Sequence, residues 1–190
     1  MKRSVMGLLA VLLFTSCGED ARPKPKAFLA LEYPEAEYEL VDVGCPYEFE
    51  INKAARIIGS RSSNPCWKNI VYDFMGGEIF ITYQPVTDNL DSLLVDAQKL
   101  PLQHTIKADA IEGAVYKNDR SRTYGMFYEV AGDAASQAQF YITDSINHFL
   151  TGSVYFNAQP NFDSILPAAA YLKEDIRHLM ETVRWKQSPL

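Results

Sequence analysis

The sequence predicts an α+β fold in which a largely antiparallel sheet is covered by two amphipathic helices. Three observations predict this class. Short apolar segments bounded by turn residues recur along the chain, the turn Met75-Gly76-Gly77 joins two of them as a hairpin, and only two stretches have helical periodicity. In chain order these elements are strands, a helix, further strands and a final helix.

The strands are predicted from short runs of apolar, β-branched and aromatic residues. They cover residues 28–33, 38–41, 46–52, 70–74, 78–83, 107–116, 124–130, 139–143 and 148–157. In the fifth of these runs, Ile79, Ile81 and Tyr83 share one face of the strand and should face the core. Residues 53–64 are expected to form a solvated loop.

The two helices are predicted from apolar residues at helical spacing. The first should begin after an N-cap at Asn89, run from Leu90 to Leu100 and end or kink at Pro101. The final helix should open at residues 161–164. Its core stripe is expected to consist of Ile165, Ala169, Leu172, Ile176, Leu179 and Val183.

The opposite side of the final helix carries Tyr171, Glu174, His178, Glu181 and Trp185. Aromatic residues at both ends of an outward stripe are unusual, because solvent faces seldom keep Trp and Tyr. A solvated face with intrahelical pairs and a partner-binding face both remain open. A cation held by the carboxylates and the imidazole would need ligands from elsewhere, and no metal is expected.

Asp144, Ser145 and His148 lie within five residues and suggest a catalytic triad. A catalytic serine needs an exposed, strained position beside a base and an oxyanion pocket, and no GxSxG motif surrounds Ser145. Turn chemistry between two strands explains the three residues better. No catalytic residue and no cofactor are therefore predicted, and an envelope serine hydrolase is kept as an alternative.

A second alternative is a ligand-binding module that uses residues 53–64. Lys53, Arg56 and Arg61 lie in this segment without an acidic residue, so they could hold an anionic glycan or a lipid headgroup.

Cys45 and Cys66 are the only cysteines that follow Cys17. A single pair in an exported protein favours a disulfide, which would contribute about 3 kcal/mol by chain entropy. Two buried free thiols remain the alternative. A zinc site is not expected, since there is no CxxC motif and no histidine lies near either cysteine.

The first 16 residues have the pattern of an export signal. Lys2 and Arg3 precede an apolar run that is too short to cross roughly 30 Å of hydrocarbon as a stable helix. The run ends in Phe14-Thr15-Ser16-Cys17, which is typical of a bacterial lipobox. We therefore expect cleavage before Cys17 and acylation of its thiol, so that the acyl chains hold the protein at a lipid bilayer.

The chain of 190 residues suits one folded domain. We expect residues 1–16 to be the lipoprotein signal, 17–27 a lipidated cysteine with an extended tether, 28–186 a single α+β domain and 187–190 a tail. The net charge of −6 argues against a nucleic-acid partner, because phosphates require a cationic track.

Several short motifs occur in a specific order over nearly the whole chain. They are Arg22-Pro23-Lys24-Pro25, Cys45-Pro46-Tyr47-Glu48-Phe49, Cys66-Trp67-Lys68-Asn69-Ile70, His104-Thr105-Ile106-Lys107-Ala108, the run TDS…HFL…YFN…PNFDS, and the closing DIRHLMETVRWK. In this order the motifs resemble the GldD family of gliding-motility lipoproteins of Bacteroidetes. By element order alone, the layout is also similar to the PsbP-like fold of thylakoid-lumen proteins.

The GldD resemblance implies an envelope lipoprotein needed for gliding and for the associated type IX protein secretion. It also suggests a partner, the CBS/CorC-like membrane protein GldE, and implies no active site. We therefore expect a non-enzymatic accessory or assembly factor, anchored in the inner or outer membrane with its domain in the periplasm.

Overall fold

The computed structural model describes residues 32–103, 108–132, 134–157 and 162–186, and the side chains of the final helix from Ile165 onward. The expected signal, Cys17, most of the first predicted strand and the tail lie outside these residues. Of that strand, Glu32 and Tyr33 are described, and they are not part of any strand. Within the described ranges, no helix combines the length and the apolar character that a membrane crossing requires.

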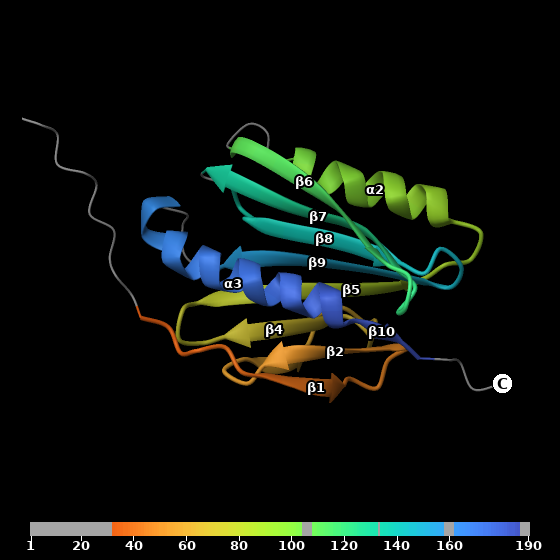
Figure 1. Cartoon of the computed structure of the whole chain (residues 1–190), viewed down its shortest axis with the longest axis horizontal. Coiled ribbons are helices and arrows are strands. Elements are labelled where there is room, and N and C mark those ends of the chain that lie inside the picture. Colours follow the sequence, from red (N-terminus) through yellow and green to blue (C-terminus); the bar gives the residue numbers. More distant parts are fainter. Residues whose placement is uncertain (1–31, 104–107, 133, 158–161, 187–190) are drawn as a thin grey trace, which may run out of the picture.

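A seven-stranded antiparallel sheet forms the centre of the fold (Figure 1). Its spatial order is β3 (Arg56–Gly59), β4 (Lys68–Tyr72), β5 (Gly77–Pro85), β9 (His148–Phe156), β8 (Ala138–Thr143), β7 (Thr123–Gly132) and β6 (Ala108–Asn118). The pairing of β5 with β9 runs from Gly77 opposite Phe156 to Pro85 opposite His148, and it joins the N-terminal and C-terminal halves of the sheet.

A second, three-stranded sheet contains β1 (Tyr38–Asp42), β2 (Tyr47–Asn52) and β10 (Arg184–Trp185), with β2 in the middle. Both neighbours of β2 are antiparallel to it. The last described segment of the chain is thus hydrogen-bonded beside one of the first strands.

The two helices, α2 (Leu90–Leu102) and α3 (Phe162–Thr182), cover opposite faces of the seven-stranded sheet. All six residues of β8 are buried, because alternate side chains are covered by different helices. Phe140 and Ile142 belong to the main core with α3, whereas Tyr141 packs in a smaller cluster with Leu93 of α2. The α+β prediction with a largely antiparallel sheet and two covering helices is confirmed.

The main core lies between α3, the large sheet and β2. All six residues of the predicted stripe on the final helix are buried: Ile165, Ala169, Leu172, Ile176, Leu179 and Val183. Ile79, Ile81 and Tyr83 of β5 are buried in the same core, as their alternation predicts.

Three local predictions were wrong. Residues 53–64 are not entirely a loop, because the β-branched pair Ile57-Ile58 lies in the short edge strand β3. Asn89 is the N-cap residue of α2, as predicted, but its side chain does not cap the helix, since its amide oxygen accepts the Thr87 N–H at 2.8 Å. The final helix ends at Thr182, so Trp185 lies in a strand.

The end of α3 is fixed by the Thr182 side chain. Its hydroxyl donates to the backbone oxygens of His178 and Leu179, at 2.9 and 3.1 Å, and accepts the N–H of Glu50 on β2 at 3.1 Å. These bonds satisfy helix-end carbonyls and direct the following residues onto β2. Pro101 ends α2 nearly as predicted, since the helix extends one residue beyond it.

Cys45 and Cys66 form a disulfide, with their Cα atoms 5.6 Å apart. The bond ties the segment just before β2 to the segment just before β4, and so links the two sheets covalently.

Candidate partner-binding surface around the final helix

A buried carboxylate, Asp175, is the polar centre of the contact between α3 and the three-stranded sheet. It is 3% exposed. The Tyr38 hydroxyl donates to its Oδ1 at 2.6 Å and the Asn52 amide donates to its Oδ2 at 2.9 Å. The helix position follows from the apolar stripe, and these bonds then align β1 and β2 against it.

Tyr171 is the first residue of the predicted outward stripe, and it is half-buried. Its hydroxyl accepts a hydrogen bond from the Asn52 amide at 2.7 Å. Its ring contacts three other aromatic rings, those of Tyr33, Tyr72 and Phe74, at centroid distances between 5.4 and 6.5 Å. The Tyr171 ring is therefore partly covered by Tyr33, from the segment before β1, and by two rings at or just beyond the end of β4.

His178 lies under the three-stranded sheet. Its Nε2 is 2.9 Å from Oε2 of Glu50, and its ring stacks on Tyr38 with centroids 3.6 Å apart. Burial, together with the hydrogen bond to Asp175, raises the pKa of the Tyr38 hydroxyl well above its ordinary value. That hydroxyl therefore stays protonated and remains a donor to the buried carboxylate.

Trp185 belongs to β10 and lies beyond the helix. Its indole N–H donates to the backbone oxygen of Arg122 at 3.1 Å, and its ring stacks on His148 at a centroid distance of 5.0 Å. The helical spacing that placed Trp185 on the same stripe as Tyr171 does not continue to this residue.

The predicted stripe is thus divided by the small sheet. Glu174 and Glu181 are exposed, whereas the other three side chains are partly covered by contacts within the chain. A partner-binding role stays a prediction for the two glutamates and the uncovered parts of their neighbours. Among the described residues, no group of three or more His, Cys, Asp and Glu side chains could hold a metal ion.

Asp144, Ser145 and His148 form a turn, as the sequence indicates. Oδ1 of Asp144 accepts the backbone N–H groups of Ile146, Asn147 and His148 at 3.0, 2.8 and 2.9 Å. Burial opposes ionisation of Asp144, but the three N–H groups outweigh burial and hold its pKa below the ordinary value. Ser145 is exposed with a positive φ of 65°.

His148 is engaged in packing rather than aimed at Ser145. Its Nδ1 is 2.8 Å from the Tyr83 hydroxyl, and its side chain is buried between that residue and Trp185. Burial is the main reason that its pKa lies below the ordinary value. The carboxylate and the imidazole of the suspected triad therefore have structural partners.

The basic segment 53–64 is also paired. Lys53 contacts Glu37 at 2.9 Å and Arg56 contacts Asp73 at 2.6 Å, both on the exposed surface. Two of the three cations proposed to hold an anion thus already have carboxylate partners.

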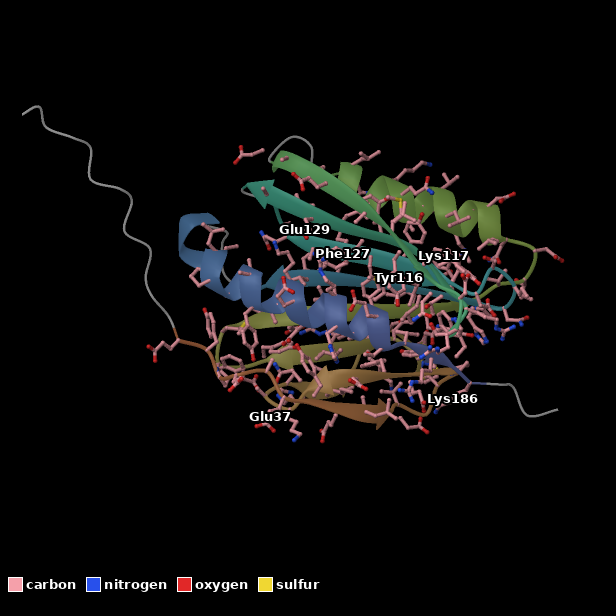
Figure 2. All side chains as sticks on the ribbon, viewed as in Figure 1. Glu37, Tyr116, Lys117, Phe127, Glu129 and Lys186 are labelled. Atoms are coloured by element: carbon pink, nitrogen blue, oxygen red, sulfur yellow. A yellow bond between two sulfur atoms is a disulfide. The ribbon has the colours of Figure 1, made fainter. Side chains whose placement is uncertain are left out.

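An ion-pair cluster that sequence reasoning missed connects β7 to α3. Glu129 contacts Lys173 at 2.7 Å and also Arg177, whose guanidinium carbon lies 4.6 Å from the centroid of the Phe127 ring. Glu129 and Phe127, both on β7, are labelled in Figure 2. The hydrogen bond from Lys173 is the largest cause of the lowered pKa of Glu129. A cavity of about 230 Å³ adjoins this cluster and is otherwise lined largely by small apolar side chains. A lone Glu in a strand gives no sequence signal for partners that lie 44 residues away.

Comparisons with known proteins agree with the predicted family. A family model described as "Gliding motility lipoprotein GldD" matches residues 18–185. Among solved structures, the chain is similar to the solution structure of cyanobacterial PsbP (CyanoP) from Synechocystis sp. PCC 6803. The two share 9% identity with a TM-score of 0.49, and the match covers 80% of this chain and 94% of the other. The comparison with curated proteins gave no match.

Proposed function

The chain belongs to the gliding motility lipoprotein GldD family, and from this premise we propose that it is a non-enzymatic, membrane-anchored assembly factor for gliding motility and type IX protein secretion. The observation that carries the proposal is the extent of the family match. The match starts one residue after Cys17 and ends at Trp185, so it includes every element of the fold.

In this proposal, acyl chains on Cys17 hold the protein in the inner or outer membrane and the folded domain stands in the periplasm. Two acyl chains anchor a protein durably, whereas a single chain does so marginally. The anchored domain acts by binding a component of the same envelope machine, and GldE is the partner we propose.

The surface that we propose for this contact is the exposed part of α3 around Glu174 and Glu181. The two residues are seven positions apart, so they lie on the same side of the helix two turns from each other. The half-buried rings of Tyr171 and His178 adjoin them. Among the described residues, neither carboxylate forms a salt bridge. A surface with two such carboxylates and aromatic edges suits a partner segment with complementary cationic side chains.

The absence of catalysis is proposed from the roles that the suspected residues already have. Asp144 organises a turn through three backbone N–H groups, and His148 packs between Tyr83 and Trp185. Ser145 can therefore be changed without losing function. Glycine is the informative substitution, because it removes the hydroxyl and accepts the positive φ of this position without strain.

The test is complementation of a strain depleted of this protein. The wild type and Ser145→Gly should both restore spreading and secretion of type IX cargo, whereas Cys17→Ala, which cannot be acylated, should restore neither. Normal cargo export in the depleted strain would refute the secretion role. Failure of a stable, membrane-bound Ser145→Gly protein would instead favour the hydrolase alternative.

The contact surface is tested by affinity capture from detergent-solubilised membranes. The charge reversals Glu174→Lys and Glu181→Lys together should abolish recovery of the bound partner while leaving the fold intact. Asp91→Lys with Asp96→Lys is the matched control, since both residues are exposed on α2. Equal recovery with both double variants would exclude the α3 surface.

A further inference from the structure

A cationic pocket lies at the end of the molecule where β10, the β6–β7 turn and the β8–β9 turn meet. It consists of two adjoining depressions of about 530 and 500 Å³ that share Arg122 and Trp185 in their walls. Arg120, Arg184 and Lys186 complete what we call the end pocket. Figure 1 shows β10, which carries two of these residues, at the end of the molecule opposite the place where the chain enters β1.

The charge of the end pocket is opposite to that of the whole chain. Four cationic side chains and two acidic ones, Glu181 and Asp144, line the depressions, although the net charge of the chain is −6. The Asp144 carboxylate is occupied by three backbone N–H groups, and Lys186 is paired with Asp42.

Unlike Lys186, the three arginines of the end pocket lack a carboxylate partner among the described residues. In the described part of the chain, Arg120, Arg122 and Arg184 are exposed and form no salt bridge. They come from two segments far apart in sequence, and the fold brings them together around Trp185. Three guanidinium groups without carboxylate partners therefore share one concave surface.

The backbone of Arg122 supports a role for its side chain. Its φ is 51°, a conformation that glycine adopts freely and that is strained in a residue with a long side chain. Local hydrogen bonds hold it there: Oδ1 of Asn118 accepts the N–H groups of Arg120 and Ser121, and Trp185 donates to the backbone oxygen of Arg122. An arginine therefore occupies a backbone position that glycine would adopt more easily.

Arg122 lines both depressions, so its charge lies beside the groups in their walls. Besides burial, which is the main cause, the positive charge of Arg122 helps to lower the pKa of His148. His148 lines the second depression together with Asn147 and Tyr83. The guanidinium is therefore close enough to this depression to affect a group in its wall.

We propose that the end pocket binds the phosphate group of an anionic ligand. A guanidinium presents a planar fork of N–H donors that matches phosphate oxygens, and charge-assisted bonds of this kind are roughly twice as strong as neutral ones. A terminal phosphate has three oxygens and up to two negative charges, so it can engage all three arginines at once. The Trp185 ring provides an apolar wall for the group that bears the phosphate.

Two sources supply this chemistry, a soluble phosphate compound and a lipid headgroup, and they are separated with two probes. Binding to the mature lipoprotein in neutral detergent is measured by calorimetry at low ionic strength. The probes are inorganic pyrophosphate and monomeric dihexanoylphosphatidic acid, with dihexanoylphosphatidylcholine as the zwitterionic reference. Saturable binding of pyrophosphate indicates a soluble ligand, and binding of the phosphatidic acid alone indicates a headgroup.

Substitutions of two pocket arginines test whether the phosphate probes bind in the end pocket. Arg122→Gly and Arg184→Gln should each weaken the affinity about 10- to 100-fold, as expected for loss of a charge-assisted hydrogen bond. Arg122→Gly should melt at the same temperature as the wild type or higher, because glycine relieves the positive φ, so a loss of binding would not reflect unfolding.

Arg56→Gln is the matched control, since it removes the same charge at the other end of the sheet. Arg56 pairs with Val71, which pairs with Glu78 at the start of β5, whereas Pro85 at the end of β5 lines the pocket. Glu78 and Pro85 are roughly 23 Å apart along the strand. The control should bind like the wild type. The proposal is overturned if neither phosphate probe binds at millimolar concentration, or if the affinity is unchanged in both pocket variants. It stands or falls independently of the secretion role.

Discussion

Replacing Asp175 by Ala should destabilise the protein more than any other single change on the surface of α3 that contacts the small sheet. The carboxylate is 3% exposed and accepts hydrogen bonds from Tyr38 at 2.6 Å and from Asn52 at 2.9 Å. A hydrogen bond to a charged group contributes about 1.5–3 kcal/mol, and a buried donor left without a partner adds a further penalty. We expect a loss of about 3–5 kcal/mol, the range typical of breaking a buried charged contact.

The loss is large relative to a total stability of about 5–15 kcal/mol. It should appear as a lower urea midpoint at pH 7, followed by circular dichroism. The melting temperature should fall by roughly 6–20 °C, since each kcal/mol shifts it by about 2–4 °C in a protein of this size.

The neighbouring residue provides the control. Glu174→Ala removes an exposed carboxylate from the preceding position of the same helix and should change stability by less than about 0.5 kcal/mol. A double-mutant cycle with Tyr38→Phe should give a coupling energy above about 1 kcal/mol. A loss from Asp175→Ala no larger than that from Glu174→Ala would refute the role assigned to this carboxylate.

Three further predictions concern covalent, electrostatic and steric features of the fold. Cys45→Ser with Cys66→Ser should cost about 3 kcal/mol in urea unfolding, and a reductant should lower the midpoint of the wild type but not that of the double variant. Because burial lowers the pKa of His148 below its ordinary 6.5, the unfolded chain binds the proton first. The contribution of His148 to the free energy of unfolding is therefore complete above about pH 6.5 and decreases as the pH falls toward the folded-state pKa. A His148→Gln variant whose stability depends on pH as that of the wild type does would contradict this prediction. Gly125→Ala should cost about 3 kcal/mol or more, because the added Cβ would lie 1.8 Å from a backbone oxygen of β8, whereas Gly59→Ala meets nothing within 4 Å and should be nearly neutral in thermal unfolding.

The helices and most strands could be predicted because the spacing of apolar residues within each element shows which of its faces is buried. Alternation in β5 and the apolar stripe of α3 identify the faces that pack in the core, and the structure buries both sets. The strand β3 was missed because it has only four residues, lies at an edge and carries Arg56. An edge strand can be short and charged, so its sequence resembles that of a loop.

The site could not be predicted to the same extent, because local periodicity does not reveal that a second, distant sheet packs on the outer side of α3. The helical pattern correctly separates Tyr171 and His178 from the core stripe of α3. It does not indicate that β1 and β2 cover them through contacts such as Tyr38–Asp175, which are 137 residues apart.

The position of the cationic end pocket could not be predicted from the sequence either. The sequence pointed to residues 53–64, where Lys53 and Arg56 lie close together in the chain. The fold gives both of them acidic partners, and it brings together Arg122 and Arg184, which form no salt bridge with any described residue. Charge density along a sequence is therefore a poor guide to charge density on a surface when the partners are distant.

The position of β2 between β1 and β10 also makes the small sheet depend on segments that lie far apart in the chain. The β1–β2 hairpin is local in sequence, whereas the second neighbour of β2 comes from Arg184 and Trp185, and Tyr38 donates to an acceptor on α3. Without these partners, β2 has an open edge and the Tyr38 hydroxyl lacks its carboxylate. Because closing such a long loop is entropically unfavourable before other contacts form, we expect the hairpin to form early and the three-stranded sheet to be completed late in folding.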